Sequence, residues 1–97
     1  MNEGFERKTI RKNEEKKLIS NRINRIIGQL TGINKMIQND SYCNDILIQL
    51  SAVENSVKSL SNQILDEHLH SCVTKDLKNG NLEIIDELIS LFKRFNK

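Results

Sequence analysis

Apolar residues recur at alternating intervals of four and three in the first part of the chain. They fall at Ile19, Ile23, Ile26, Leu30, Ile33 and Ile37. Because residues at these intervals lie on one side of an α-helix, the spacing predicts a first helix with a narrow apolar stripe. The polar residues that follow include Asn39, Asp40 and Ser41, which are typical of turns and helix caps. We therefore expect a turn at this point.

A second and longer apolar stripe begins directly after the turn. Its members are Cys43, Ile46, Leu50, Val53, Val57, Leu60 and Ile64, and steps of four continue it through His68 to Cys72. The chain contains no proline, and no glycine lies between Gly32 and Gly80. Since neither helix-breaking residue interrupts the stripe, one helix is expected from about residue 42 to residue 78.

The last part of the chain predicts a short third helix. Gly80 is expected to stop the long helix, and Asn81 is a candidate cap for the next one. The apolar residues of this third helix are Leu82, Ile85, Leu88, Ile89, Phe92 and Phe95. No segment shows the alternation of a β-strand. The predicted fold class is therefore all-α, with one long central helix flanked by two shorter ones.

Length and charge suggest how this fold is used. We expect a single helical domain over residues 17–97, preceded by a basic, flexible tail over residues 1–16. Residues 1–25 carry eight Lys or Arg against four acidic residues, whereas the remainder carries seven against nine. A basic leading segment suits a polyanionic partner, although a solvated tail would have the same composition. The chain has neither a bilayer-length apolar run nor a signal peptide, so a cytoplasmic protein without a membrane partner is expected.

The segment "DEHLHSC", residues 66–72, concentrates possible metal ligands in the long helix. His68 and Cys72 are four residues apart and share a helix face, whereas His70 points elsewhere and is expected at the surface. Cys43 stands 25 residues before His68, which is ~37 Å along a continuous helix. One chain therefore cannot bring these three residues together.

Two chains can do so if their long helices pack antiparallel. Pairing Cys43 with the midpoint of 68 and 72 places the two-fold axis near Val57 and yields two equivalent Cys, His, Cys sites per dimer. Two thiolates and an imidazole favour Cu(I), with Zn(II) as the main competitor. The ordinary alternative is that both cysteines pack as small apolar residues. No catalytic constellation is present, so neither an enzyme nor a small-molecule substrate is expected.

Several motifs together resemble one protein family. They are "RIIGQLTG" at Arg25–Gly32, the segment Asp40–Val53 and the H-x-x-x-C of residues 68–72. The segment Asn21–Val73, with "IIDELISLFKRF" at Ile84–Phe95, is similar to the CsoR/RcnR family of bacterial metal-responsive repressors. The resemblance implies helical dimers that pair into tetramers and bind double-stranded operator DNA.

The resemblance also implies a ligand set. In the copper-sensing branch, the ligands are a cysteine from one subunit and a histidine and cysteine from its neighbour, which match Cys43, His68 and Cys72. A nickel- or cobalt-sensing relative would carry additional histidines, but none precedes His68. A formaldehyde-responsive relative would have proline where Asn2 stands, and a persulfide-sensing relative would lack the histidine. His68 is therefore the discriminating residue.

Further residues match positions to which the family assigns roles. Tyr42 and Glu87 correspond to residues that transmit metal binding to the DNA surface, and either could accept the second ring N–H of a metal-bound His68. The candidate DNA contacts are Arg22, Arg25, Gln29 and Lys58. The implied function is a copper(I)-responsive repressor that holds its operator when metal-free and releases copper resistance genes when Cu(I) binds.

Two other functions fit the same residues. A thiol-based sensor of persulfide or oxidants would use Cys43 and Cys72 of different subunits, with His68 acting only on thiol reactivity. A helical interaction module without DNA would use the basic segment to bind a protein or RNA, with both cysteines in its core. Metal stoichiometry separates these possibilities.

Overall fold

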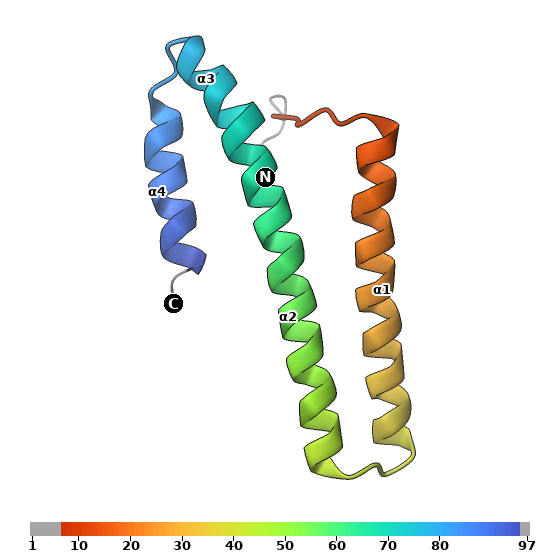
Figure 1. The fold of residues 1–97 in the computed structure, drawn as a ribbon. Helices are drawn as coiled ribbons and strands as arrows, with labels where there is room; N and C mark the ends of the chain where they lie inside the picture. Colours follow the sequence, from red (N-terminus) through yellow and green to blue (C-terminus); the bar gives the residue numbers. More distant parts are fainter. Residues whose placement is uncertain (1–6, 96–97) are drawn as a thin grey trace. The chain divides into compact units, whose positions relative to one another are not determined.

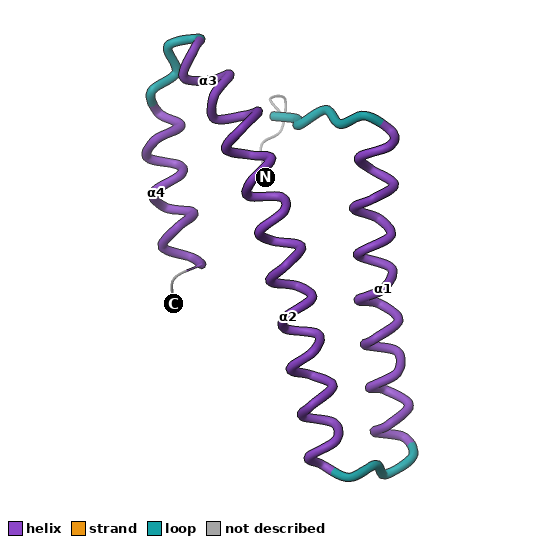
Figure 2. Tube along the Cα trace, viewed as in Figure 1, coloured by secondary structure: helices purple, strands orange, loops and turns teal. Residues whose placement is uncertain are grey.

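The computed structural model describes residues 7–95, and within that range the backbone forms helices and short turns without a strand (Figures 1 and 2). The elements are α1 (Asn13–Gln38), α2 (Cys43–Glu67), the π-helix η1 (His68–Val73), α3 (Thr74–Lys78) and α4 (Glu83–Phe95). The segments α2, η1 and α3 follow one another without a turn. The predicted all-α fold, with a long central helix between two shorter ones, is confirmed. No helix within residues 7–95 is both long and apolar enough to cross a bilayer.

The first helix is longer than its apolar stripe. It begins at Asn13, six residues before Ile19, and its first turn carries Glu14 and Glu15. Negative side chains at this end are favourable because the helix dipole is positive there. Residues 13–16, which were expected in the tail, are thus helical, and residues 1–6 lie outside the described range. The division of the chain at residue 16 stays a prediction.

The same turn ends both α1 and α3. After α1, Asp40 takes a left-handed φ of 55°, and the amide of Ser41 donates to the carbonyl of Met36 at 2.9 Å. After α3, Gly80 has a φ of 79°, and the amide of Asn81 bonds back into the helix in the same way. This left-handed turn satisfies carbonyl groups that the helix end leaves free. The predicted stop at Gly80 is confirmed.

Residues 1–62 form the first of two compact units, and in it α1 and most of α2 make an antiparallel hairpin (Figure 1). Ile33 and Val53 are its buried residues. Half-buried residues at intervals of seven extend this contact along both helices. We call the whole set the inner row: Ile19, Ile26, Ile33, Ile46, Val53 and Leu60. The inner row is the core of the hairpin.

The rest of each predicted stripe remains at the surface. On α1 these residues are Ile23, Leu30 and Ile37, which are 40 to 52% exposed, and on α2 they are Cys43, Leu50 and Val57. We call these six residues the outer row. Their spacing of seven is that of a helix face that packs against another helix. Each predicted stripe therefore consists of two rows, of which the hairpin buries only one.

The second unit, residues 63–97, contains the end of α2, η1, α3 and α4. The chain turns at residues 79–82, and α4 buries Ile84, whose side chain is 1% exposed. Val73 of η1 is buried as well. Other large apolar residues of α4, and the residue before it, remain exposed: Leu82, Ile85, Ile89, Phe92 and Phe95. This unit too has more apolar surface than it covers by itself.

We predict that Gly80→Ala lowers the free energy of unfolding by about 1 kcal/mol, because an L-residue with a side chain is strained at positive φ. A Cβ at this position meets nothing within 4 Å, so the backbone strain is the whole cost. Urea unfolding at fixed protein concentration measures it. Gly80→Asn is the matched control and should lose less, since asparagine tolerates this conformation. An alanine variant as stable as the wild type would contradict the assigned turn.

Candidate metal centre and nucleic-acid interface

The three predicted metal ligands lie at the two ends of α2. Cys43 is the first residue of α2 and is exposed, while His68 and Cys72 lie in η1 and are half-buried. Among residues 7–95, no group of three or more His, Cys, Asp or Glu side chains could hold a metal ion. Cys43 is the first of the 25 residues of α2, and the rest of that helix separates it in sequence from the other two ligands. That a site using all three residues draws them from two chains stays a prediction.

The π-helix η1 is the feature of this region that the sequence did not predict. The backbone of His68–Val73 is π-helical, and next to it the side-chain hydroxyl of Thr74 donates to the carbonyl of Leu69 at 2.9 Å. A π-helix bonds across five residues rather than four, and such segments are rare and frequent at functional sites. Since a spacing of four lies close to one turn in both helix types, His68 and Cys72 still share a face. Apolar spacing therefore could not have distinguished the two.

His70 contacts Asp66 on its own helix and is not part of the pair formed by His68 and Cys72. Its Nδ1 lies 2.9 Å from the backbone oxygen of Asp66 and 3.3 Å from the Oδ1 of the same residue. Both side chains are about three-quarters exposed. The prediction that His70 is a surface histidine is confirmed.

Tyr42 and Glu87 belong to different units of the chain. Tyr42 directly precedes α2, is 72% exposed, and its carbonyl accepts the amide of Ile46 at 3.2 Å. This contact makes Tyr42, rather than Asn39, Asp40 or Ser41, the N-cap residue of α2. Glu87 is exposed on the first half of α4. The roles of Tyr42 and Glu87 in signalling stay predictions.

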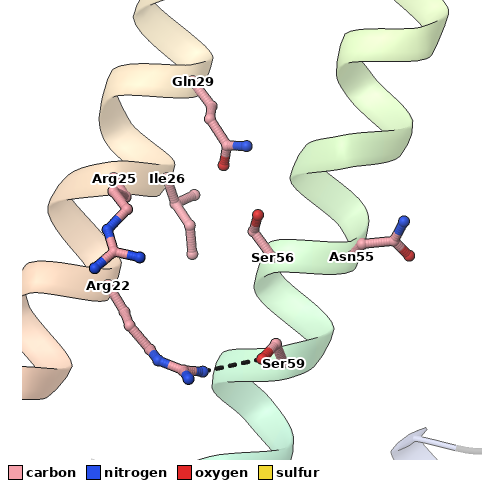
Figure 3. Close-up of a pocket in the computed structure, with 7 residues that line it drawn as sticks. All are labelled: Arg22, Arg25, Ile26, Gln29, Asn55, Ser56 and Ser59. Atoms are coloured by element: carbon pink, nitrogen blue, oxygen red, sulfur yellow. Dashed lines mark hydrogen bonds between the residues drawn. The ribbon is translucent and has the colours of Figure 1, made fainter.

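Three of the four candidate DNA contacts meet in one depression between α1 and α2, which has a volume of about 370 Å³ (Figure 3). We call it the arginine pocket. Its lining residues are Arg22, Arg25, Ile26 and Gln29 of α1 and Asn55, Ser56 and Ser59 of α2. Arg22 donates to the Oγ of Ser59 at 2.9 Å. Lys58 is exposed on α2 but does not line the pocket.

Sequence reasoning did not predict the contribution of α2 to this pocket. Ser59 and Asn55 are four residues apart and share a face, which is the only signal the sequence offers. That signal became informative only when the hairpin placed this face beside Arg22.

Comparison with known proteins identifies the family. A family model described as a metal-sensitive transcriptional repressor matches residues 15–94. The chain belongs to this family. It is 44% identical over 95 residues to the copper-sensing transcriptional repressor CsoR of Bacillus subtilis strain 168, which covers 95% of this chain and 94% of that protein. It is 42% identical over 67 residues to the copper-sensing repressor RicR of Mycobacterium tuberculosis, which covers 69% of this chain and 70% of that one.

Solved structures support the same assignment. The crystal structure of the copper-sensing repressor CsoR with Cu(I) from Geobacillus thermodenitrificans matches with a TM-score of 0.88 and 36% identity, covering 93% of this chain and 95% of that one. The nickel-responsive regulator InrS matches with a TM-score of 0.72 and 32% identity, covering 90% and 99%. The family expected from the motifs is thus confirmed, and the protein is a regulator of transcription rather than an enzyme.

Proposed function

We propose that this protein is a copper(I)-responsive repressor whose metal sites form between two subunits. Each site would take Cys43 from one protomer and His68 and Cys72 from its partner. The observation that carries the proposal is the outer row, which contains Cys43 and forms an apolar surface that the hairpin of α1 and α2 leaves exposed. The copper-sensing relatives support the choice of metal.

The donor set fits Cu(I). Neither Cys43 nor Cys72 is in a disulfide, and His68 shares a helix face with Cys72. Two soft thiolates and an imidazole make the three-coordinate environment that suits Cu(I), whereas Zn(II) usually takes a fourth ligand.

The outer row supports an antiparallel pair of long helices. Val57, 44% exposed, lies near the expected two-fold axis, and Leu50 is 37% exposed beside it. A second copy that packs its own outer row here would bury these residues, and burial of apolar surface is the main favourable term in association. The exposed side of α4 adds apolar surface that pairing of dimers into a tetramer would cover.

Regulation follows from linkage between two binding events. In the metal-free state, the arginine pocket and Lys58 would hold double-stranded operator DNA through phosphate contacts. Bound copper would supply strong, directional bonds to the three ligands. Glu87 and Tyr42 are the candidates to accept the second ring N–H of His68 and so to move α4 or the start of α2. The coupling is reciprocal, so DNA must weaken copper binding by the same free energy.

We predict that reduced protein binds about one Cu(I) per chain against a competing chelator and releases DNA as it does so. Cys43→Ala, His68→Ala and Cys72→Ala should keep DNA binding. Each should weaken copper binding by more than the ~10- to 100-fold that loss of a supporting hydrogen bond costs. Fluorescence anisotropy of a labelled duplex from upstream of the gene measures release. His70→Ala is the control and should behave as wild type. A Cys43→Ala variant with full copper response would disprove the ligand set.

A mixing experiment tests whether the site spans two chains. Neither Cys43→Ala nor the double variant His68→Ala/Cys72→Ala has a complete site as a homodimer. A mixed dimer should regain one complete site of its two, because the intact Cys43 of one chain meets the intact pair of the other. Copper titration before and after subunit exchange shows the gain. If mixing restores no binding, the ligands do not come from different chains.

We expect Val57→Arg to abolish dimers, because it places a charge at the centre of the apolar seam. Analytical ultracentrifugation over a range of concentrations gives the oligomeric state. Ile48→Arg is the matched control. Ile48 is 56% exposed, but it lies on the opposite side of α2 from Val57, so this variant should still dimerise. Dimers of unchanged stability in Val57→Arg would refute the proposed seam.

A further inference from the structure

The arginine pocket carries positive charge that the chain itself does not neutralise. Its lining includes Arg22 and Arg25 but no acidic residue. Neither arginine forms an ion pair with any residue in the range 7–95. Two guanidinium groups beside one depression repel each other, and an anion between them would relieve that repulsion. The pocket therefore has the electrostatics of an anion site.

The polar groups of the pocket are also only partly satisfied. The Oε1 of Gln29 is buried and accepts no hydrogen bond. Ser56 donates to the backbone oxygen of Ala52 at 3.0 Å, so its hydroxyl is already committed. An anion cannot donate to this oxygen, but rotating the amide by 180° would turn its NH2 donor towards the pocket, where it could bond to an anion.

The bond from Arg22 to Ser59 gives this site a definite geometry (Figure 3). Arg22 is an exposed and flexible side chain that reaches from α1 to a hydroxyl on α2. A guanidinium group has five N–H donors, so one bond to Ser59 leaves others for an anion. Holding the side chain in place beforehand lowers the entropy that binding must overcome.

We propose that the arginine pocket seats a backbone phosphate of the bound DNA, and that Ser59 is a positioning residue that holds Arg22 for this contact. The inference rests on the proposed function as a DNA-binding repressor and adds a residue on α2 that the motifs do not mark. On α1, Arg22 and Gln29 each stand four residues before a member of the inner row, whereas Ile23 and Leu30 each stand four residues after one. Because these two offsets lie on opposite sides of a helical residue, the pocket and the outer row lie on different sides of the inner row. Dimerisation through the outer row thus leaves the pocket open.

The test is operator affinity as a function of salt for Ser59→Ala in the full chain. We expect affinity to fall about three- to tenfold, the range of one lost hydrogen bond, with an unchanged salt slope because no charge is removed. Arg22→Ala should lower the slope by about one. The double variant should bind no more weakly than Arg22→Ala alone, and Ser59→Thr should restore wild-type affinity. Ser51→Ala, on the same helix but outside the pocket, is the control.

The outcomes separate this inference from the proposed function. Wild-type protein that fails to bind the duplex overturns both. If the wild type binds but Ser59→Ala matches it, or if the losses from Ser59→Ala and Arg22→Ala add in full, only the role of Ser59 is overturned. Thermal unfolding in inorganic phosphate against chloride at equal ionic strength tests a free anion as the occupant. A saturable, Arg22-dependent stabilisation at about 1 mM phosphate, together with wild-type operator affinity in Arg22→Ala, would assign the pocket to that anion and overturn the DNA contact.

Discussion

The packing of apolar residues at intervals of seven is the constraint on which the rest of this molecule depends. Within the hairpin, the inner row brings α1 and α2 together through Ile33 and Val53 and their half-buried neighbours. The same helices carry the outer row, which the chain leaves at its surface. A chain of 97 residues buries only a small core, and here about half of the apolar pattern of α1 and α2 lies outside the core of the hairpin. The proposed pairing with another chain would bury these exposed residues.

The division of each stripe into two rows also separates the proposed metal-binding surface from the proposed DNA-binding surface. The outer row runs along α1 and α2 on one side of the hairpin core, and the arginine pocket opens on the other. The proposed metal site at a subunit seam would therefore not compete with the proposed DNA surface of Arg22, Arg25 and Ser59. Both would use residues of α2, which is where the two proposed sites could be coupled.

The proposed metal ligands stand far apart in the sequence. Cys43 is at the start of α2, and His68 and Cys72 lie just beyond its end. If the site forms between two chains, as proposed, metal binding would depend on how the two chains are arranged. The π-helix His68–Val73 gives two of the proposed ligands an unusual backbone, of a kind that is frequent at functional sites.

Much of the fold followed from local patterns. The helices were predicted from the periodicity of apolar residues and the absence of proline, and the turn after α3 was predicted from Gly80. These predictions hold because helix formation and termination depend on neighbours in sequence. The spacing of Cys43, His68 and Cys72 likewise predicted that one chain is insufficient, since helix rise is constant. The π-helix escaped prediction because a spacing of four residues suits both helix types. Only the tertiary structure decided which half of each apolar stripe is buried. It also decided that Arg22 bonds to Ser59, 37 residues away in sequence. Both features depend on how the two helices are rotated against each other.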